Sequence, residues 1–176
     1  MTRTIRIAGF GGQGVMLLGQ IIAYAATLKN LNSTWVPTYG PETRGGTANC
    51  MVTISSEQVY SPVFNHCDDL IVFNAPSFHK FKLLVKDKGK IYYNSSLVSS
   101  IEQSTVDTIA VACNDLALDL ENSKVINIIM LGRYLKDLNL FGESEVESAL
   151  LHFFGESKKE LIPINIEAFR LGQELN

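Results

Sequence analysis

The residues whose spacing most clearly suggests a chemical role are glycines near the start of the chain. They follow the spacing G-x-G-x-x-G and form, with one glutamine, a glycine loop: Gly9, Gly11, Gly12, Gln13 and Gly14. A short apolar run at residues 5–8 predicts a buried strand before the loop, and residues 15–28 predict a helix after it. In that setting, glycines let backbone N–H groups approach a phosphate at a helix N-terminus. The pattern predicts an anion site without naming the ligand.

A second segment, residues 37–49, has the composition of a shaped loop. It holds two prolines and three glycines in thirteen residues, which indicates fixed turns. Its only charged residues are Glu42 and Arg44. Two interpretations stay open: these charges pair with each other at the surface, or Arg44 reaches an anion or a partner chain. Long ordered loops are usually functional. The candidate residues in it are Tyr39, Gly40, Pro41, Glu42, Arg44, Gly45 and Gly46.

The strand expected at residues 33–37 argues against a nicotinamide cofactor at the glycine loop. A dinucleotide-binding fold places Asp or Glu at the end of this strand, where the carboxylate holds the ribose 2′-OH. Here the nearest acid is Glu42, which lies beyond a Tyr-Gly-Pro turn. The glycine loop also lacks the lysine of a P-loop, so nucleotide hydrolysis is not expected.

Histidines and cysteines do not complete a reactive site in this sequence. No two cysteines have C-x-x-C spacing, and each histidine falls on a different predicted element. These residues are Cys50, Cys67, Cys113, His66, His79 and His152. We therefore expect inert buried thiols, structural histidines and no metal held by this chain. An anion-binding loop without an acid, base or nucleophile around it is typical of a binding or assembly subunit.

Length and composition predict one globular domain over residues 1–176. Apolar residues make up 46% of the chain and charged residues 19%, which predicts a buried core. The net charge of −3 argues against nucleic acid as a partner. No apolar run reaches the length of about 18 residues that a membrane span needs. The first four residues enter a strand directly, so we expect no signal peptide and a cytoplasmic protein.

Alternating strands and helices predict an α/β fold, a three-layer α/β/α sandwich with a mixed, mostly parallel, Rossmann-like sheet. Strands are expected at residues 5–8, 33–37, 50–55, 59–61, 69–73, 89–94 and 108–112. The sheet is expected to be mixed because residues 50–55 and 59–61 have a hairpin signal. A turn is expected at residues 86–89. Helices are expected at residues 15–28, 74–85, 116–121 and 124–138, after a capping box at residues 144–147, and at residues 166–175.

The helix expected at residues 15–28 is apolar nearly all round. Gly19 lies on a face of small residues that allows close packing on a sheet, and the opposite side is apolar as well. Such a helix is buried on more than one side. Either a partner subunit or second copy covers it, or it is a central helix of its own fold.

Three blocks of sequence together resemble the gamma subunit of 2-oxoacid:ferredoxin oxidoreductases. They are G-F-G-G-Q-G-V at residues 9–15, Y-G-P-E-T-R-G-G at residues 39–46, and Ser61-Pro62. The resemblance covers roughly residues 3–85, and the remainder fits in length and predicted class. The run G-G-T-A-N-C at residues 45–50 is most similar to the 2-oxoglutarate branch, with the branched-chain and pyruvate branches as alternatives.

The resemblance implies a subunit of a larger enzyme. Complexes of this family convert a 2-oxoacid, CoA and oxidised ferredoxin to acyl-CoA, CO₂ and reduced ferredoxin. The resemblance places thiamine diphosphate, Mg²⁺ and 4Fe-4S clusters on alpha, beta and, where present, ferredoxin-like delta chains, with no cofactor held by this chain alone. It also implies that the glycine loop lies near CoA and that residues 39–46 form a subunit interface or active-site wall. The rival hypotheses are a stand-alone nucleotide-binding oxidoreductase and a small-molecule sensor.

Overall fold

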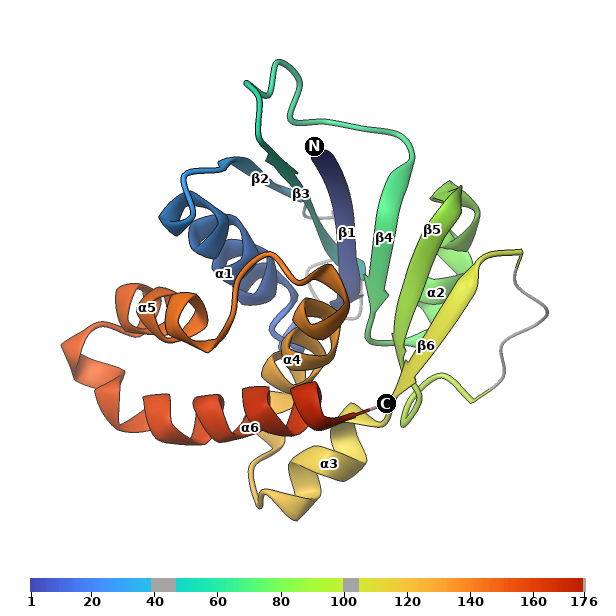
Figure 1. Ribbon diagram of the computed structural model, residues 1–176. Coiled ribbons are helices and arrows are strands. Elements are labelled where there is room, and N and C mark those ends of the chain that lie inside the picture. The colour runs from blue at the N-terminus through green and yellow to red at the C-terminus, as the bar shows by residue number, and fades with distance from the viewer. Residues whose placement is uncertain (39–46, 100–104, 176) are drawn as a thin grey trace.

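A mixed six-stranded sheet forms the centre of the fold (Figure 1). The computed structural model describes residues 1–38, 47–99 and 105–175. The strand order is β2-β3-β1-β4-β5-β6; β3 is antiparallel to both of its neighbours, and the remaining pairs are parallel. The strands are β1 (Thr2–Phe10), β2 (Asn32–Thr38), β3 (Thr47–Ser55), β4 (Cys67–Val72), β5 (Val85–Asn94) and β6 (Asp107–Val111).

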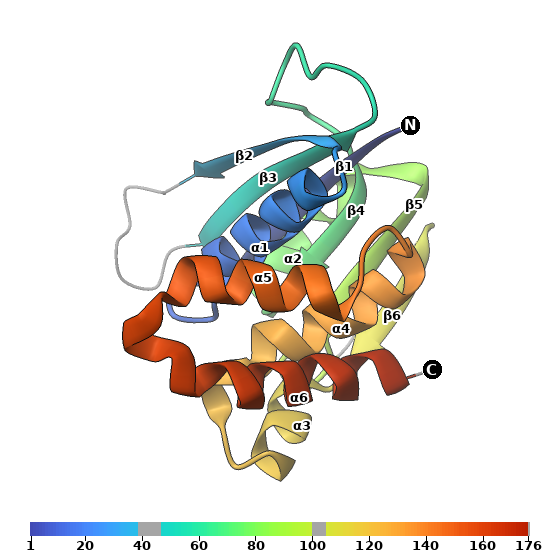
Figure 2. The same ribbon diagram turned by 60° about the vertical axis from the view of Figure 1, so that its left-hand side comes forward.

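Helices cover both faces of the sheet, so the predicted three-layer α/β/α arrangement is confirmed. Helices α1, α4, α5 and α6 lie on one face, and α2 lies on the other (Figures 1 and 2). None of the helices in the described ranges has the length and apolar character needed to cross a membrane. The helices are α1 (Val15–Leu28), α2 (Ala75–Phe81), α3 (Cys113–Asp119), α4 (Ile126–Leu138), α5 (Glu143–Phe154) and α6 (Ile162–Glu174).

Alternation along the central strands divides the apolar side chains between two cores. Ile5 and Ile7 of β1 point to the face covered by α1 and α4, whereas Ala8 points to the face covered by α2. Burial on both faces explains why consecutive residues are apolar at Ile7 and Ala8 of β1 and from Leu70 to Val72 of β4.

Helix α1 lies between the sheet and α5, which accounts for its apolar sequence (Figure 2). On the outer side, Tyr24 stacks on His152 of α5 with ring centroids 4.3 Å apart. On the sheet side, a Cβ atom at Gly19 would lie only 2.6 Å from Cys50 Sγ, so glycine permits the close approach. The chain's own elements therefore bury α1, and a partner subunit is not needed to explain its composition.

The predicted hairpin of residues 50–55 with residues 59–61 is wrong. Residues 59–61 are not in a strand, and β3 pairs with β2 and β1 instead. The register places Thr47 opposite Phe10, and Asn49 opposite both Thr38 and Ala8. The sheet is mixed as predicted, but the antiparallel partner comes from earlier in the chain.

Two further local predictions differ from the structure. Residues 86–89, expected as a turn, lie inside β5, where the pairing with β4 shifts register between Cys67 and Asp69. Helix α5 begins one residue before the predicted capping box, and Glu145 Oε2 accepts the backbone N–H of Gly142 at 2.9 Å. The predicted turn is therefore absent, and the predicted capping box at residues 144–147 is wrong in register, because the helix is capped at Gly142 with Glu145 as its third residue.

A buried carboxylate, that of Asp69, attaches α4 to the sheet at the edge where the parallel strands begin. The Asp69 carboxylate is fully buried and accepts two hydrogen bonds of 2.7 Å from Arg3. It accepts a third, of 2.8 Å, from the hydroxyl of Tyr134 on α4. This bidentate, fully partnered arrangement fixes α4 across the sheet. The first turn of the same helix lies at the opposite edge.

Candidate functional site

The glycine loop lies at the edge of the sheet where the parallel strands end. It follows β1 and leads into α1, which crosses one face of the sheet. The neighbouring parallel strand β4 leads into α2, which crosses the other face. Adjacent strands whose connections leave in opposite directions create a crevice beyond their carboxyl ends, the usual ligand site of open α/β sheets. The glycine loop occupies this position.

Gln13 fixes the shape of the glycine loop from within. Its Oε1 accepts the backbone N–H of Phe10 at 2.7 Å and the side-chain amide of Asn74 at 3.2 Å. Its Nε2 donates to the carbonyl of Phe73 at 3.5 Å. Phe73 and Asn74 directly follow β4, so Gln13 joins the ends of the two strands at the crevice. Both ends of the amide are bonded to protein, which makes Gln13 a positioning residue of the loop.

Gly14 and Asn127 join the glycine loop to α4. Gly14 has φ 74°, in the left-handed region that favours glycine, and its carbonyl accepts the N–H of Leu18 as the first bond of α1. The same carbonyl accepts a hydrogen bond of 3.3 Å from Asn127 Nδ2. The Asn127 side chain occupies the space that a Cβ atom at residue 14 would need. Position 14 thus requires glycine for both its conformation and its packing.

The outer side of the loop is open. Gly11 and Gly12 are exposed, and a Cβ atom at either position would meet no atom of the described residues within 4 Å. The first-turn N–H groups of α1 have no intrahelical acceptors, and within ranges 1–38, 47–99 and 105–175 no side chain caps this helix. These donors, with the positive end of the helix dipole, suit an anion. Residues 9–14 contain no titratable side chain, so the loop has the chemistry to bind a group and not to transfer protons.

The second predicted segment begins and ends at the same edge. Residues 39–46, which carry all seven candidates from Tyr39 to Gly46, lie outside the described residues. The residues on either side of them are Thr38 at the end of β2 and Thr47 at the start of β3. Thr47 is opposite Phe10 of the glycine loop in the sheet, and its hydroxyl oxygen lies 3.3 Å from Lys80 Nζ of α2.

Sheet order adds a second argument against a nicotinamide site. The strand whose carboxyl end carries the ribose-binding acid normally lies next to β1. In this protein β3 lies between β1 and β2, which puts the end of β2 two strand spacings, about 10 Å, from the glycine loop. The absent acid and the displaced strand agree.

The three thiols do not fit an iron–sulfur cluster or a metal ion. They lie on β3, β4 and the start of α3, and all three are buried. Burial raises the pKa of Cys50 to about 12 and that of Cys67 to about 11, and it also raises the pKa of Cys113. Among the described residues, no three His, Cys, Asp or Glu side chains come together as a metal site. These cysteines behave as small apolar residues of the core.

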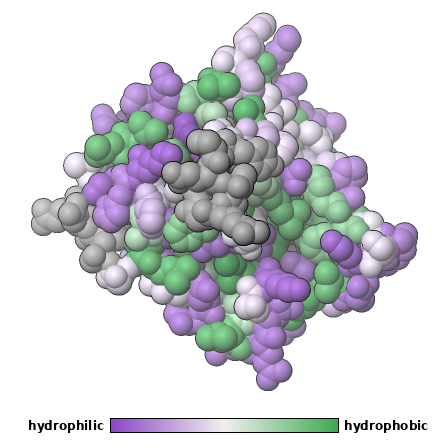
Figure 3. Space-filling model, turned by 180° about the vertical axis from the view of Figure 1, so that it is seen from behind, coloured by the Kyte–Doolittle hydropathy of each residue, from purple (hydrophilic) through white to green (hydrophobic). Residues whose placement is uncertain are grey.

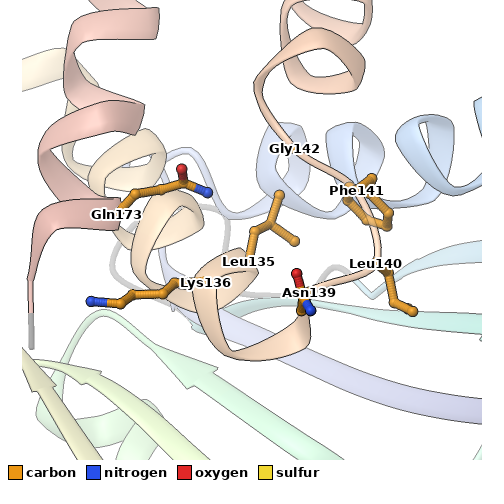
Figure 4. A pocket seen from close by; sticks show the side chains of 7 residues that line it. All are labelled: Leu135, Lys136, Asn139, Leu140, Phe141, Gly142 and Gln173. Carbon is orange, nitrogen blue, oxygen red and sulfur yellow. The ribbon is translucent and has the colours of Figure 1, made fainter.

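Two surface hollows lined by described residues do not include any residue of the glycine loop. One, of about 430 Å³, lies between the end of α4, the start of α5 and α6 (Figure 4). It includes Asn139, twelve residues or about 18 Å along the helix from Asn127. A second, of about 460 Å³, lies between α5 and α6. On the coloured part of the face behind the sheet, hydrophobic and hydrophilic side chains are interspersed (Figure 3). We place the candidate site at the crevice because backbone N–H groups there suit a ligand. The volumes of the two hollows do not decide its position.

Sequence reasoning found the glycine loop and missed three side chains around it: Asn74, Asn127 and Lys80. Asn74 caps α2, accepting the N–H of Ser77 at 2.9 Å, and an Asn directly after a predicted buried strand is a signal for this edge. Asn127 is a polar residue in the otherwise apolar start of α4, a weaker signal. For Lys80 the sequence contains no signal, because its contact with Thr47 joins residues 33 positions apart.

Comparison with known proteins gives consistent matches along the chain. Residues 4–175 match the family described as Pyruvate ferredoxin/flavodoxin oxidoreductase. The ketoisovalerate oxidoreductase subunit VorA of Methanothermobacter thermautotrophicus is 36% identical over 97% of this chain and 35% of its own length. The 2-oxoglutarate synthase subunit KorC of Methanocaldococcus jannaschii is 32% identical over 99% of this chain and 94% of its own length.

Among solved structures, this chain matches one protein over nearly its whole length and another over only part of its length. The gamma subunit of a keto/oxoacid ferredoxin oxidoreductase from Geobacter sulfurreducens has a TM-score of 0.83 and 28% identity, covering 98% of this chain and 96% of that one. A 2-oxoglutarate:ferredoxin oxidoreductase from Magnetococcus marinus, with 2-oxoglutarate, coenzyme A and succinyl-CoA bound, has a TM-score of 0.86 and 26% identity. It is covered over 30% of its chain. This chain likewise spans about a third of the length of the VorA proteins.

Proposed function

We propose, from the premise that this chain belongs to the pyruvate ferredoxin/flavodoxin oxidoreductase family, that it is the gamma subunit of a 2-oxoacid:ferredoxin oxidoreductase. The observation that carries this proposal is the fraction of each chain that is covered when this chain is aligned with its relatives. The chain and the Geobacter gamma subunit cover each other almost completely, whereas the chain covers only a third of the longer relatives. The match therefore supports one component of an enzyme whose other components are separate chains.

The glycine loop is the part of this subunit that meets a substrate. Its open N–H groups and the start of α1 suit a phosphate, and CoA is the phosphate-bearing substrate of the proposed reaction. The loop contributes binding and orientation, since residues 9–14 include no acid or base. Thiamine diphosphate, Mg²⁺ and iron–sulfur clusters belong in this proposal to partner chains, where they supply the chemistry of decarboxylation and electron transfer to ferredoxin.

Residues 39–46 are the proposed contact with the catalytic chains. The residues that flank them, Thr38 and Thr47, lie at the edge that carries the glycine loop. A contact there brings a partner chain beside the proposed CoA site. Arg44 is the only cation in the segment, and its guanidinium can hold a carboxylate or a phosphate through two hydrogen bonds.

2-Oxoglutarate is the proposed 2-oxoacid. The KorC relatives from M. jannaschii and Archaeoglobus fulgidus match this chain over 94% and 86% of their own lengths and are named 2-oxoglutarate synthase subunits. 3-Methyl-2-oxobutanoate (ketoisovalerate) is the second candidate, because two VorA proteins have 33% and 36% identity. The side chains that choose between substrates belong to the catalytic chains in this proposal, so the choice is tested on the complex.

Reconstitution tests the proposal. The chain is co-expressed with candidate thiamine- and cluster-binding chains from the same organism, and reduction of ferredoxin is followed with CoA and each of 2-oxoglutarate, 3-methyl-2-oxobutanoate and pyruvate. We expect CoA-dependent turnover that is highest with 2-oxoglutarate and absent when this chain is omitted. Tight NAD binding by the isolated chain, or 2-oxoacid oxidation without any partner, supports the stand-alone oxidoreductase instead.

A further inference from the structure

Asn127 is a buried amide in an apolar setting. It lies in the first turn of α4 between Ile126 and Ile128, and only 3% of its surface is exposed. Its Nδ2 donates to the carbonyl of Gly14, 113 residues earlier in the chain. This contact joins the C-terminal helices to the glycine loop.

Folding alone accounts poorly for an amide at this position. The Gly14 carbonyl already accepts the N–H of Leu18 at 2.9 Å, and the bond from Asn127 is a second, longer one of 3.3 Å. Burying an amide removes it from water, and one long hydrogen bond returns little of that loss. A leucine of similar size fills the same space without this penalty. The amide therefore has a role that packing does not supply.

The geometry of the peptide unit indicates this role. The carbonyl of Gly14 and the N–H of Val15 belong to one planar unit and point in opposite directions. Leu18 holds this carbonyl from within α1 and Asn127 holds it from α4, so the two donors together restrict the direction of the N–H more than the helix bond alone does. Val15 is the first residue of α1, and its N–H is among the first-turn donors without an intrahelical acceptor.

We propose that Asn127 is a positioning residue that sets the affinity of the glycine loop for CoA by orienting the Gly14–Val15 peptide unit. The inference rests on the proposed function and adds a residue and a mechanism to it. Asn127 completes a set of three neutral amides around the loop, with Gln13 and Asn74. Neutral side chains shape the loop without competing with a bound anion for its N–H groups.

The test compares variants in the reconstituted complex, with KM for CoA and kcat measured separately and the melting temperature measured alongside. Asn127→Leu removes the donor and keeps the volume, and we expect KM for CoA to rise about two- to tenfold with little change in kcat. Asn127→Asp places a negative charge beside the loop. We expect KM to rise about tenfold or more, and the rise to shrink as salt is added.

Asn165→Asp is the matched control. Asn165 is also buried, lies on α6 and donates to a backbone carbonyl, that of Leu161, at 2.7 Å. We expect this control to lower the melting temperature and leave KM for CoA unchanged. If the Asn127→Asp complex does not assemble, Asn127→Leu and direct CoA binding to its complex decide the question.

Two results overturn the inference: an unchanged KM for CoA in the Asn127 variants, or an equal rise in the Asn165→Asp control. The wild-type complex separates this failure from that of the proposed function. Normal CoA-dependent turnover with unaffected Asn127 variants overturns the role of Asn127 alone. A wild-type complex without CoA-dependent turnover overturns the proposed function, and this inference with it.

Discussion

Alanine substitutions along the glycine loop should destabilise the protein in a graded order. At Gly11 an added Cβ meets none of the described atoms within 4 Å and φ is not positive, so we expect a change within about 0.5 kcal/mol. Gly12 has the same open space but φ 91°, which costs about 1–2 kcal/mol for an L-residue. Gly14 combines φ 74° with overlap onto Asn127, whose Cγ and Cβ would lie 2.6 Å and 3.0 Å from the new atom. Strain and overpacking together give about 2–5 kcal/mol.

Urea unfolding of the isolated chain measures this series directly. For a chain of this length, 2–5 kcal/mol corresponds to a loss of about 4–20 °C in melting temperature. The Gly14→Ala change should also be partly relieved by Asn127→Ala, because the overlapping atoms are removed, so the two effects should not add. The reasoning is refuted if Gly11→Ala destabilises the chain as much as Gly14→Ala does. In the complex, by contrast, Gly11→Ala should weaken CoA binding, since its Cβ occupies the open side.

Three further predictions concern the core, the pH dependence and the interface. Asp69→Ala should destabilise the chain by about 2–4 kcal/mol in urea melts, because it leaves the buried hydroxyl of Tyr134 and the half-buried guanidinium of Arg3 without their partner. Asp68→Ala, at the more exposed pair with Lys86, should cost about 1–2 kcal/mol, and equal losses would contradict this expectation. The free energy of unfolding should fall as pH rises above about 9, by about 1.4 kcal/mol per pH unit for each buried thiol, because the pKa values of Cys50 and Cys67 are higher in the folded chain than in the unfolded chain. Cys67→Ala should make this pH dependence less steep. An unchanged pH dependence in that variant argues against a role for the Cys67 thiol. Arg44→Ala should leave the melting temperature of the lone chain unchanged and lower the activity of the reconstituted complex, and Arg44→Lys should restore part of that activity. Full activity of the Arg44→Ala complex means that the guanidinium contacts neither a partner chain nor a substrate.

The local signals in the sequence predicted the part of the fold in which we propose the site. The strand, glycine loop and helix from residue 5 to residue 28 follow from apolar patterning and turn chemistry, and the structure has α1 with the predicted bounds, Val15–Leu28. The pairing of β3 was not predictable in this way. A hairpin to residues 59–61 and insertion between β2 and β1 use the same alternating side chains, and only the whole sheet decides between them.

The residues missed at the site were those supplied from a distance. Asn127 reaches Gly14 across 113 residues, and no local periodicity encodes such a contact. The sequence also did not decide what buries α1, because an apolar helix does not reveal whether its own chain or another one covers it; in the structure α5 packs on its outer side. Local chemistry thus identified the loop, while the shape of its surroundings required the tertiary structure.

Native mass spectrometry of the protein purified from its source, through a tag on this chain, shows whether the chain is one component of a larger oxidoreductase. We expect one assembly of fixed stoichiometry that contains this chain with thiamine- and cluster-binding chains. The isolated chain should be colourless and inactive with a 2-oxoacid, CoA and viologen. Recovery of only the 19.4 kDa chain or its own oligomers, with iron–sulfur content or turnover of its own, would contradict the account.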